Sequence, residues 1–170
     1  DQEEPVSLNQ EEHTEYRGGA GVAQYLAEDQ PHLKFATKEV LRDAHEPSQH
    51  SVRRLKRIGR FVKGAPRLII TYPWQRRPSV LKTKADSNWA GCKQTRKSTT
   101  CVVVMRGAHS LKELSLTQDT PALSSGQAEL QAAVRAVVEG LYAKHMLKFY
   151  EDEVELELST DSSAAIGTMN

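Results

Sequence analysis

Three carboxylates occupy positions where secondary-structure elements are expected to begin or end, and together they could bind divalent metal ions. Asp86 closes an expected strand, Glu129 lies in the first two turns of an expected helix, and Asp161 follows another expected strand. Strand ends and helix starts are where sheet-based sites gather their ligands. Mg²⁺ prefers oxygen ligands, and a cation relieves the repulsion among clustered acids. Two such ions about 3.5–4 Å apart suit phosphodiester hydrolysis.

Each of the three acids also has an ordinary structural explanation. Asp86 could be a turn residue, Glu129 could stabilise the first turn of its helix, and Asp161 could be an N-cap. The residues alone therefore leave open whether the three carboxylates form one site.

The middle of the chain is strongly basic, although the formal net charge of the whole chain is only +1. Residues 48–112 hold 16 Lys or Arg and one acid, Asp86, whereas both flanking segments are net acidic. Such a block is typical of proteins that neutralise nucleic-acid phosphates. The alternative is a solvated charged face that pairs with the acidic flanks. We favour a nucleic-acid partner.

Length and composition exclude several protein classes. The 170 residues, 38% hydrophobic and 26% charged, can form one domain, or a small domain with a helical appendage. Stretches of about 18 apolar residues are absent, and the acidic start is unlike a signal peptide, so we expect an intracellular protein without a membrane anchor. The sequence does not separate cytoplasm from nucleus. Cys92, Cys101 and His109 match no common zinc spacing.

The first half of the chain has helical patterns. We expect a disordered acidic tail over residues 1–15 and a helical segment over 16–72. Within this segment we expect helices over 16–26, from 31 to before Pro47, and over 48–64, followed by a short strand over 68–72. The third helix is amphipathic and basic, and Arg53, Arg57 and Arg60 lie off its apolar face. A proline-containing linker then covers 73–78.

The second half has the mixed pattern of an α/β domain. Strands are expected over 80–85, 99–106 and 108–116, then a long helix from Ser124 to about Phe149. Ser124 and Gln127 have capping-box spacing. Strict alternation predicts a further strand over 154–158, and residues 161–163 would cap a last helix.

Four ordered motifs in this second half resemble the ribonuclease H domain of copia-type retrotransposon Pol polyproteins. These motifs are Asp86-Ser87-Asn88-Trp89-Ala90-Gly91, Arg96-Lys97-Ser98-Thr99-Thr100, Ala122-Leu123-Ser124-Ser125-Gly126-Gln127-Ala128-Glu129 and Thr160-Asp161-Ser162-Ser163-Ala164-Ala165-Ile166. Three upstream motifs are similar to the tail of the reverse transcriptase that precedes that domain. They are Tyr16-Arg17-Gly18-Gly19, Tyr25-Leu26-Ala27 and Leu55-Lys56-Arg57-Ile58-Gly59-Arg60-Phe61-Val62-Lys63-Gly64. The resemblance covers about residues 16–170.

The resemblance implies an α/β fold, a ribonuclease H-like mixed sheet with flanking helices, preceded by a small helical segment. It implies hydrolysis of the RNA strand of an RNA–DNA hybrid with two Mg²⁺ or Mn²⁺ ions. Asp86, Glu129 and Asp161 match the family's first three metal-binding catalytic acids. The expected partners are the hybrid and the remainder of the polyprotein, including the reverse transcriptase. For contacts to nucleic acid we expect Ser87, Asn88, Arg96, Lys97 and Ser98, together with Arg53, Arg57 and Arg60.

The resemblance also implies that the family's fourth metal-binding acid and last strand would follow Asn170, so the domain over 79–170 is expected to be C-terminally incomplete. Two other functions therefore stay open. One is a non-catalytic, nucleic-acid-binding remnant of such a polyprotein, with the basic residues but no assembled metal site. The other is a protein-interaction fragment whose basic and acidic blocks pair internally.

Overall fold

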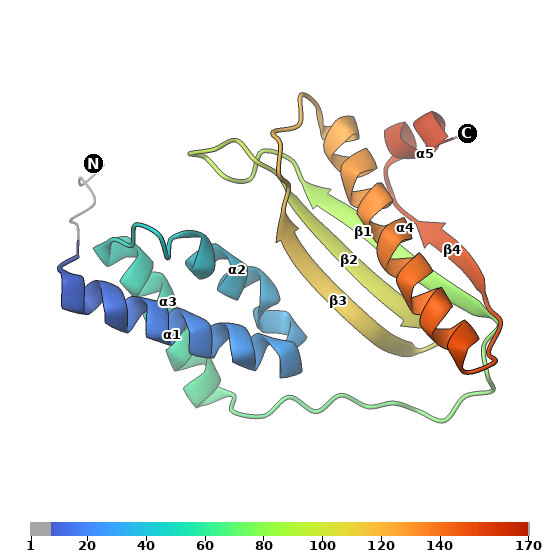
Figure 1. Cartoon of the computed structure of the whole chain (residues 1–170), viewed down its shortest axis with the longest axis horizontal. Coiled ribbons are helices and arrows are strands. Elements are labelled where there is room, and N and C mark those ends of the chain that lie inside the picture. Colours follow the sequence, from blue (N-terminus) through green and yellow to red (C-terminus); the bar gives the residue numbers. More distant parts are fainter. Residues whose placement is uncertain (1–7, 170) are drawn as a thin grey trace. The chain divides into compact units, whose positions relative to one another are not determined.

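The chain divides into two compact units, and the boundary in the sequence lies between Ile70 and Thr71 (Figure 1). The structure is a computed structural model that describes residues 8–169, so residues 1–7 of the expected acidic tail lie outside the described residues. Among the described helices, none has both the length and the apolar character needed to cross a membrane.

The first unit is helical, as expected. It contains α1 (Gln10–Asp29), a short 3-10 helix η1 (Pro31–Leu33), α2 (Lys34–Arg42) and α3 (Gln49–Gly64). The expectation of disorder up to residue 15 is wrong for residues 10–15, because a capping box begins α1 early. The Asn9 side chain accepts a bond from the Glu12 N–H, and the Glu12 carboxylate accepts one from the Asn9 N–H, both 2.9 Å long.

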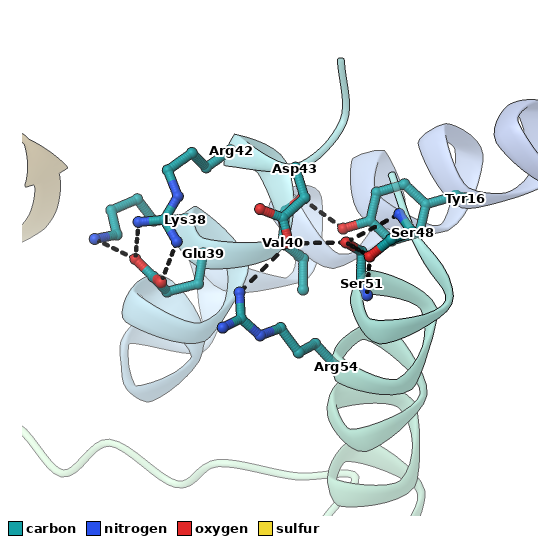
Figure 2. Close-up of polar contacts among 9 residues, drawn as sticks. All are labelled: Tyr16, Lys38, Glu39, Val40, Arg42, Asp43, Ser48, Ser51 and Arg54. Carbon is teal, nitrogen blue, oxygen red and sulfur yellow. Dashed lines mark hydrogen bonds and ion pairs between the residues drawn. The ribbon is translucent and has the colours of Figure 1, made fainter. Parts of the chain in front are cut away.

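A polar network ties the end of α2 to α1 and α3 (Figure 2). The Tyr16 hydroxyl of α1 donates to the Val40 carbonyl of α2 at 2.6 Å. The Ser51 hydroxyl of α3 donates to Asp43 at 2.9 Å, and Arg54 pairs with the same carboxylate oxygen at 3.4 Å. This network lies beside an apolar core formed by the three α-helices and η1: Tyr16, Ala20, Ala23, Ala27, Leu33, Val40 and Ile58.

The second unit is a four-stranded mixed sheet with helices. Its elements are β1 (Val80–Asn88), β2 (Thr99–Arg106), β3 (His109–Thr117), α4 (Ser125–Phe149), β4 (Glu155–Ser159) and α5 (Ser163–Met169). The strand order is β3-β2-β1-β4, in which β1 is antiparallel to β2 and parallel to β4. The expected α/β class, with a mixed sheet and flanking helices, is thus confirmed.

The expected strand over 68–72 is wrong. Residues 66–79 contain no strand. The apolar run Leu68-Ile69-Ile70 has β-propensity, but its side chains are exposed and no neighbouring strand pairs with it. Propensity without a pairing partner leaves this segment as an extended connection.

Helix α4 connects β3 to β4 and covers one face of the sheet (Figure 1). It buries its small residues against the sheet, among them Ala132, Ala133 and Ala136, whereas its larger Val134 and Leu141 are exposed. A Cβ atom added to Gly140 would lie 2.6 Å from a Leu156 methyl and 2.7 Å from the Thr83 methyl. The helix therefore approaches the sheet closely because its contact face is small.

Candidate metal centre

The structure brings the three acids together at one edge of the sheet. Asp86, Glu129 and Asp161 each offer one oxygen, and these oxygens all lie within 4.8 Å of one another. Glu129 is half-buried, and the two aspartates are exposed. Asp86 comes from β1, Glu129 from the first turns of α4, and Asp161 from the segment between β4 and α5.

The parallel pairing of β1 with β4 explains why the two aspartates meet. In this register Lys84 lies beside Ser159, so Asp86 and Asp161 each follow two residues later on neighbouring segments. Parallel strands end at the same edge of a sheet, where polar ligands can converge. The sequence predicted that this strand ends at Asp86. That bound is wrong, because pairing with β2 extends β1 to Asn88.

Ser87 fixes one oxygen of Glu129. Its main-chain N–H donates to Glu129 Oε1 at 3.2 Å, and its hydroxyl donates to the same oxygen at 2.7 Å. The other oxygen, Oε2, is buried and accepts no hydrogen bond from the described residues. A buried carboxylate oxygen without a partner is costly, and a metal ion would remove that cost. The donor set, three carboxylates with one orphaned oxygen, fits a hard divalent cation.

Gln118 holds the start of α4 against the sheet. Its buried side-chain amide donates to Thr100 Oγ1 at 3.0 Å and to the Ala128 carbonyl at 2.9 Å. Thr100 belongs to β2, and Ala128 precedes Glu129 on α4. The two bonds of Gln118 therefore hold the first turns of α4, which carry Glu129, against β2. The sequence analysis missed this residue, since a single Gln after a strand has no distinguishing pattern.

The expected capping box of α4 is only half formed. Ser124 Oγ accepts a bond from the Gln127 N–H at 3.2 Å, as a capping residue should. The Gln127 side chain instead accepts a bond from the Leu123 N–H at 2.7 Å, rather than from Ser124. The helix still begins next to Ser124, so Glu129 lies in its first two turns, as predicted.

The loop between β1 and β2 lies next to this cluster in the sequence, and two of its bonds fix it in place. The Trp89 indole donates to the Ala122 carbonyl at 3.0 Å, and the Ala90 N–H donates to Ser98 Oγ at 3.0 Å. Ser98 is fully buried. The expectation that Ser98 contacts nucleic acid is therefore corrected, because its hydroxyl supports the loop and presents no surface to a ligand.

The other residues expected to contact nucleic acid have different surroundings. Asn88 and Arg96 are exposed and Lys97 is half-buried in the same loop region, whereas the Ser87 hydroxyl is engaged with Glu129. A further set is exposed on α3 of the first unit and forms no ion pair within the described part of the chain: Arg53, Arg57 and Arg60.

A groove of about 720 Å³ lies elsewhere in the second unit, between α4 and the β2–β3 side of the sheet. Its walls include Leu116, Val134 and Val138, and none of the three acids lines it. The carboxylate cluster is an open edge site, which a large substrate could reach more readily than an enclosed cavity.

Comparison with known proteins finds three relatives at about one-third identity. It is 32% identical over 128 residues to the uncharacterized mitochondrial protein AtMg00810 of Arabidopsis thaliana, across 74% of this chain and 52% of that protein. It is 33% and 32% identical over 121 residues to the retrovirus-related Pol polyproteins from transposons RE1 and RE2 of the same plant, across 70% of this chain.

The chain spans about half the length of the first relative and 8% of each Pol polyprotein. No family model matches the chain. No solved structure matches it either. The resemblance to retrotransposon Pol polyproteins is confirmed to this extent: the chain is similar to a segment of the Pol polyproteins from transposons RE1 and RE2.

Proposed function

We propose that the second unit is a ribonuclease H-like domain that hydrolyses the RNA strand of an RNA–DNA hybrid. The observation that carries the proposal is the carboxylate cluster: Asp86, Glu129 and Asp161 offer oxygens within 4.8 Å of one another. The two relatives named retrovirus-related Pol polyproteins support the proposal, because the resemblance that implies a ribonuclease H domain is a resemblance to Pol polyproteins.

Asp86, Glu129 and Asp161 would hold Mg²⁺ or Mn²⁺. When bound, two such ions supply an activated water and stabilise the leaving oxygen of the phosphodiester. The protein's own residues prepare the site: Ser87 orients Glu129, and the exposed aspartates leave the cluster accessible to a phosphate backbone. The carboxylates would bind these ions without reading the base sequence of the substrate.

The substrate contacts follow from exposure and charge. Asn88, Arg96 and Lys97 belong to the β1–β2 loop region next to Asp86 in the chain and have surface available for contacts to the sugar-phosphate backbone. Selection of RNA would depend on 2′-hydroxyl contacts across the wide, shallow minor groove of the hybrid. The first unit would belong to the end of the reverse transcriptase in a longer polyprotein, and the α3 arginines would add phosphate contacts.

Cleavage of a labelled RNA strand in a hybrid, with Mg²⁺ or Mn²⁺, tests the proposal. We expect the unaltered chain to cleave, and Asp86→Asn and Asp161→Asn each to abolish cleavage with little loss of hybrid affinity, because metal ligands serve the reaction more than phosphate contacts. Glu153→Gln is the matched control, since Glu153 is an exposed acid outside the cluster. Normal cleavage by both aspartate variants would show that the site is assigned wrongly.

The exposed arginines of α3 favour a second candidate, a nucleic-acid-binding remnant without catalysis. Such a protein would bind the hybrid in a salt-sensitive manner and cleave nothing in either metal. The same experiment separates the two functions, because it measures binding and cleavage on the same chain. Absence of hybrid affinity at moderate salt would exclude both and favour a protein-interaction fragment.

A further inference from the structure

We propose that Ser87 is a positioning residue, which orients the Glu129 carboxylate in the proposed metal site. The inference rests on the proposed function, since it concerns the same three acids. It assigns Ser87 a role that differs from the nucleic-acid contact expected from the sequence.

The geometry of the two hydrogen bonds is the basis for this role. Both donors of Ser87, the main-chain N–H at 3.2 Å and the hydroxyl at 2.7 Å, bond to the same oxygen of Glu129. Two converging donors define which oxygen is occupied and restrict rotation of the carboxylate group. Oε2 is left as the buried oxygen without a hydrogen-bond partner among the described residues.

The position of Ser87 in β1, directly after Asp86, lets two neighbouring residues serve the same site. Asp86 and Ser87 are consecutive residues of β1. Asp86 offers a carboxylate oxygen to the cluster, and Ser87 donates its hydroxyl hydrogen bond to Glu129 on α4. One dipeptide therefore supplies one ligand and orients another that lies 42 residues away from Ser87.

Orientation matters for metal affinity because a free carboxylate must give up rotational freedom on binding. Residues that hydrogen-bond a metal ligand typically contribute about 10–100-fold to metal affinity or activity. Ser87→Ala removes the shorter bond and keeps the main-chain bond. We therefore expect the affinity for Mn²⁺ to fall about 10-fold, at the lower end of that range.

The test is a Mn²⁺ titration of the whole chain in the absence of nucleic acid, read by electron paramagnetic resonance of the free ion. Ser87→Ala should weaken binding about 10-fold, and Ser87→Thr should restore it because the hydroxyl returns. Ser115→Ala is the matched control: Ser115 is also a strand serine, and its hydroxyl has no hydrogen-bond partner among the described residues. Thermal unfolding of each variant confirms that the folded chain is being compared.

A second measurement separates positioning from substrate contact. Hybrid affinity is measured in EDTA, where the metal site is empty and only direct contacts count. Positioning predicts that Ser87→Ala leaves this affinity unchanged. A loss of hybrid affinity with unchanged Mn²⁺ affinity would overturn the proposal and support the contact expected from the sequence.

Glu129→Gln distinguishes the failure of this inference from the failure of the metal site. If Glu129→Gln weakens Mn²⁺ binding and Ser87→Ala does not, the site stands and the role of Ser87 is wrong. If neither substitution changes Mn²⁺ binding, or the unaltered chain binds none, the metal site itself is wrong, and the positioning role fails with it.

Discussion

The Tyr16 hydroxyl and the Val40 carbonyl, 24 residues apart, form a buried hydrogen bond of 2.6 Å that joins α1 to the end of α2 (Figure 2). Tyr16 is 2% exposed, so its hydroxyl cannot exchange this partner for bulk water. The bond anchors the helical unit at the point where α2 ends and the turn toward α3 begins.

Replacing Tyr16 by Phe should lower the free energy of unfolding of the first unit by about 1 kcal/mol. The ring would still fill the core, whereas the Val40 carbonyl would lose its donor from α1. Urea unfolding followed by circular dichroism measures the change. A stability equal to that of the unaltered chain would show that this hydrogen bond contributes nothing net.

The raised pKa of Tyr16 predicts that the free energy of unfolding falls at alkaline pH. Burial, reinforced by the nearby Asp43 carboxylate, raises the pKa of Tyr16 from 10.0 to about 12. The unfolded chain therefore releases this proton first, so the stabilisation is complete below pH 10 and is lost as the pH rises toward 12. Unfolding free energies measured across this range should decline more steeply for the unaltered chain than for Tyr16→Phe. Equal slopes would contradict the assignment.

In the second unit, the lowered pKa of Asp152 predicts that the free energy of unfolding falls at acidic pH. Hydrogen bonds from Arg106 hold the pKa of Asp152 below its ordinary value of 3.8, against the opposing effect of burial, and Arg77 pairs with it at 2.9 Å. Because the folded pKa is lowered, the stabilisation is present above about pH 4 and is lost as the pH falls further.

Asp152→Asn should remove this acid-dependent part of the unfolding free energy, whereas Glu153→Gln, at the exposed neighbouring acid, should retain it. Acid titration of the unfolding midpoint compares the two variants. Identical pH profiles for both would show that the Arg106–Asp152 pair does not couple folding to protonation.

Gly140 predicts the effect of enlarging the contact face of α4. A Cβ there would meet Leu156 and the stiff side chain of Thr83, so Gly140→Ala should destabilise the second unit by about 1–3 kcal/mol despite the higher helix propensity of alanine. Gly59→Ala in α3 is the control, because a Cβ at Gly59 meets nothing within 4 Å and should stabilise its helix by about 0.5–1 kcal/mol. Chemical unfolding of both variants tests the contrast, and a stabilising Gly140→Ala would contradict the close approach.

The exposed arginines of α3 predict a salt dependence of nucleic-acid binding. Each of Arg53, Arg57 and Arg60 that contacts a phosphate should contribute about one unit to the slope of log affinity against log salt. Arg57→Ala should therefore reduce the slope by about 1, whereas Arg17→Ala on α1, the same change of net charge, should leave it unaltered. Fluorescence anisotropy at several salt concentrations measures both, and equal slopes would remove α3 from the binding surface.

Local patterns in the sequence were sufficient for most elements of the fold. β-Branching predicted β2 over 99–106, alternation predicted β4 to within a residue, and apolar periodicity predicted α3 and α4 to within a residue of their observed bounds. These patterns report backbone preference, which acts over a few residues. They did not give the buried face of α4, because its small residues face the sheet and its larger Val134 and Leu141 are exposed. The same reasoning failed over 68–72, because a strand also needs a neighbouring strand and propensity says nothing about one.

The candidate site divides in the same way. The sequence was enough to name Asp86, Glu129 and Asp161, since acids at element boundaries and ordered motifs are visible in one dimension. Only the tertiary structure decided that Ser98 is buried, that Gln118 holds α4, and that Ser87 turns toward Glu129. These roles depend on contacts between residues far apart in the chain, whose distances are set by the strand order and by the close packing of α4. Short-range patterns determine the elements, and long-range packing determines which side chains meet.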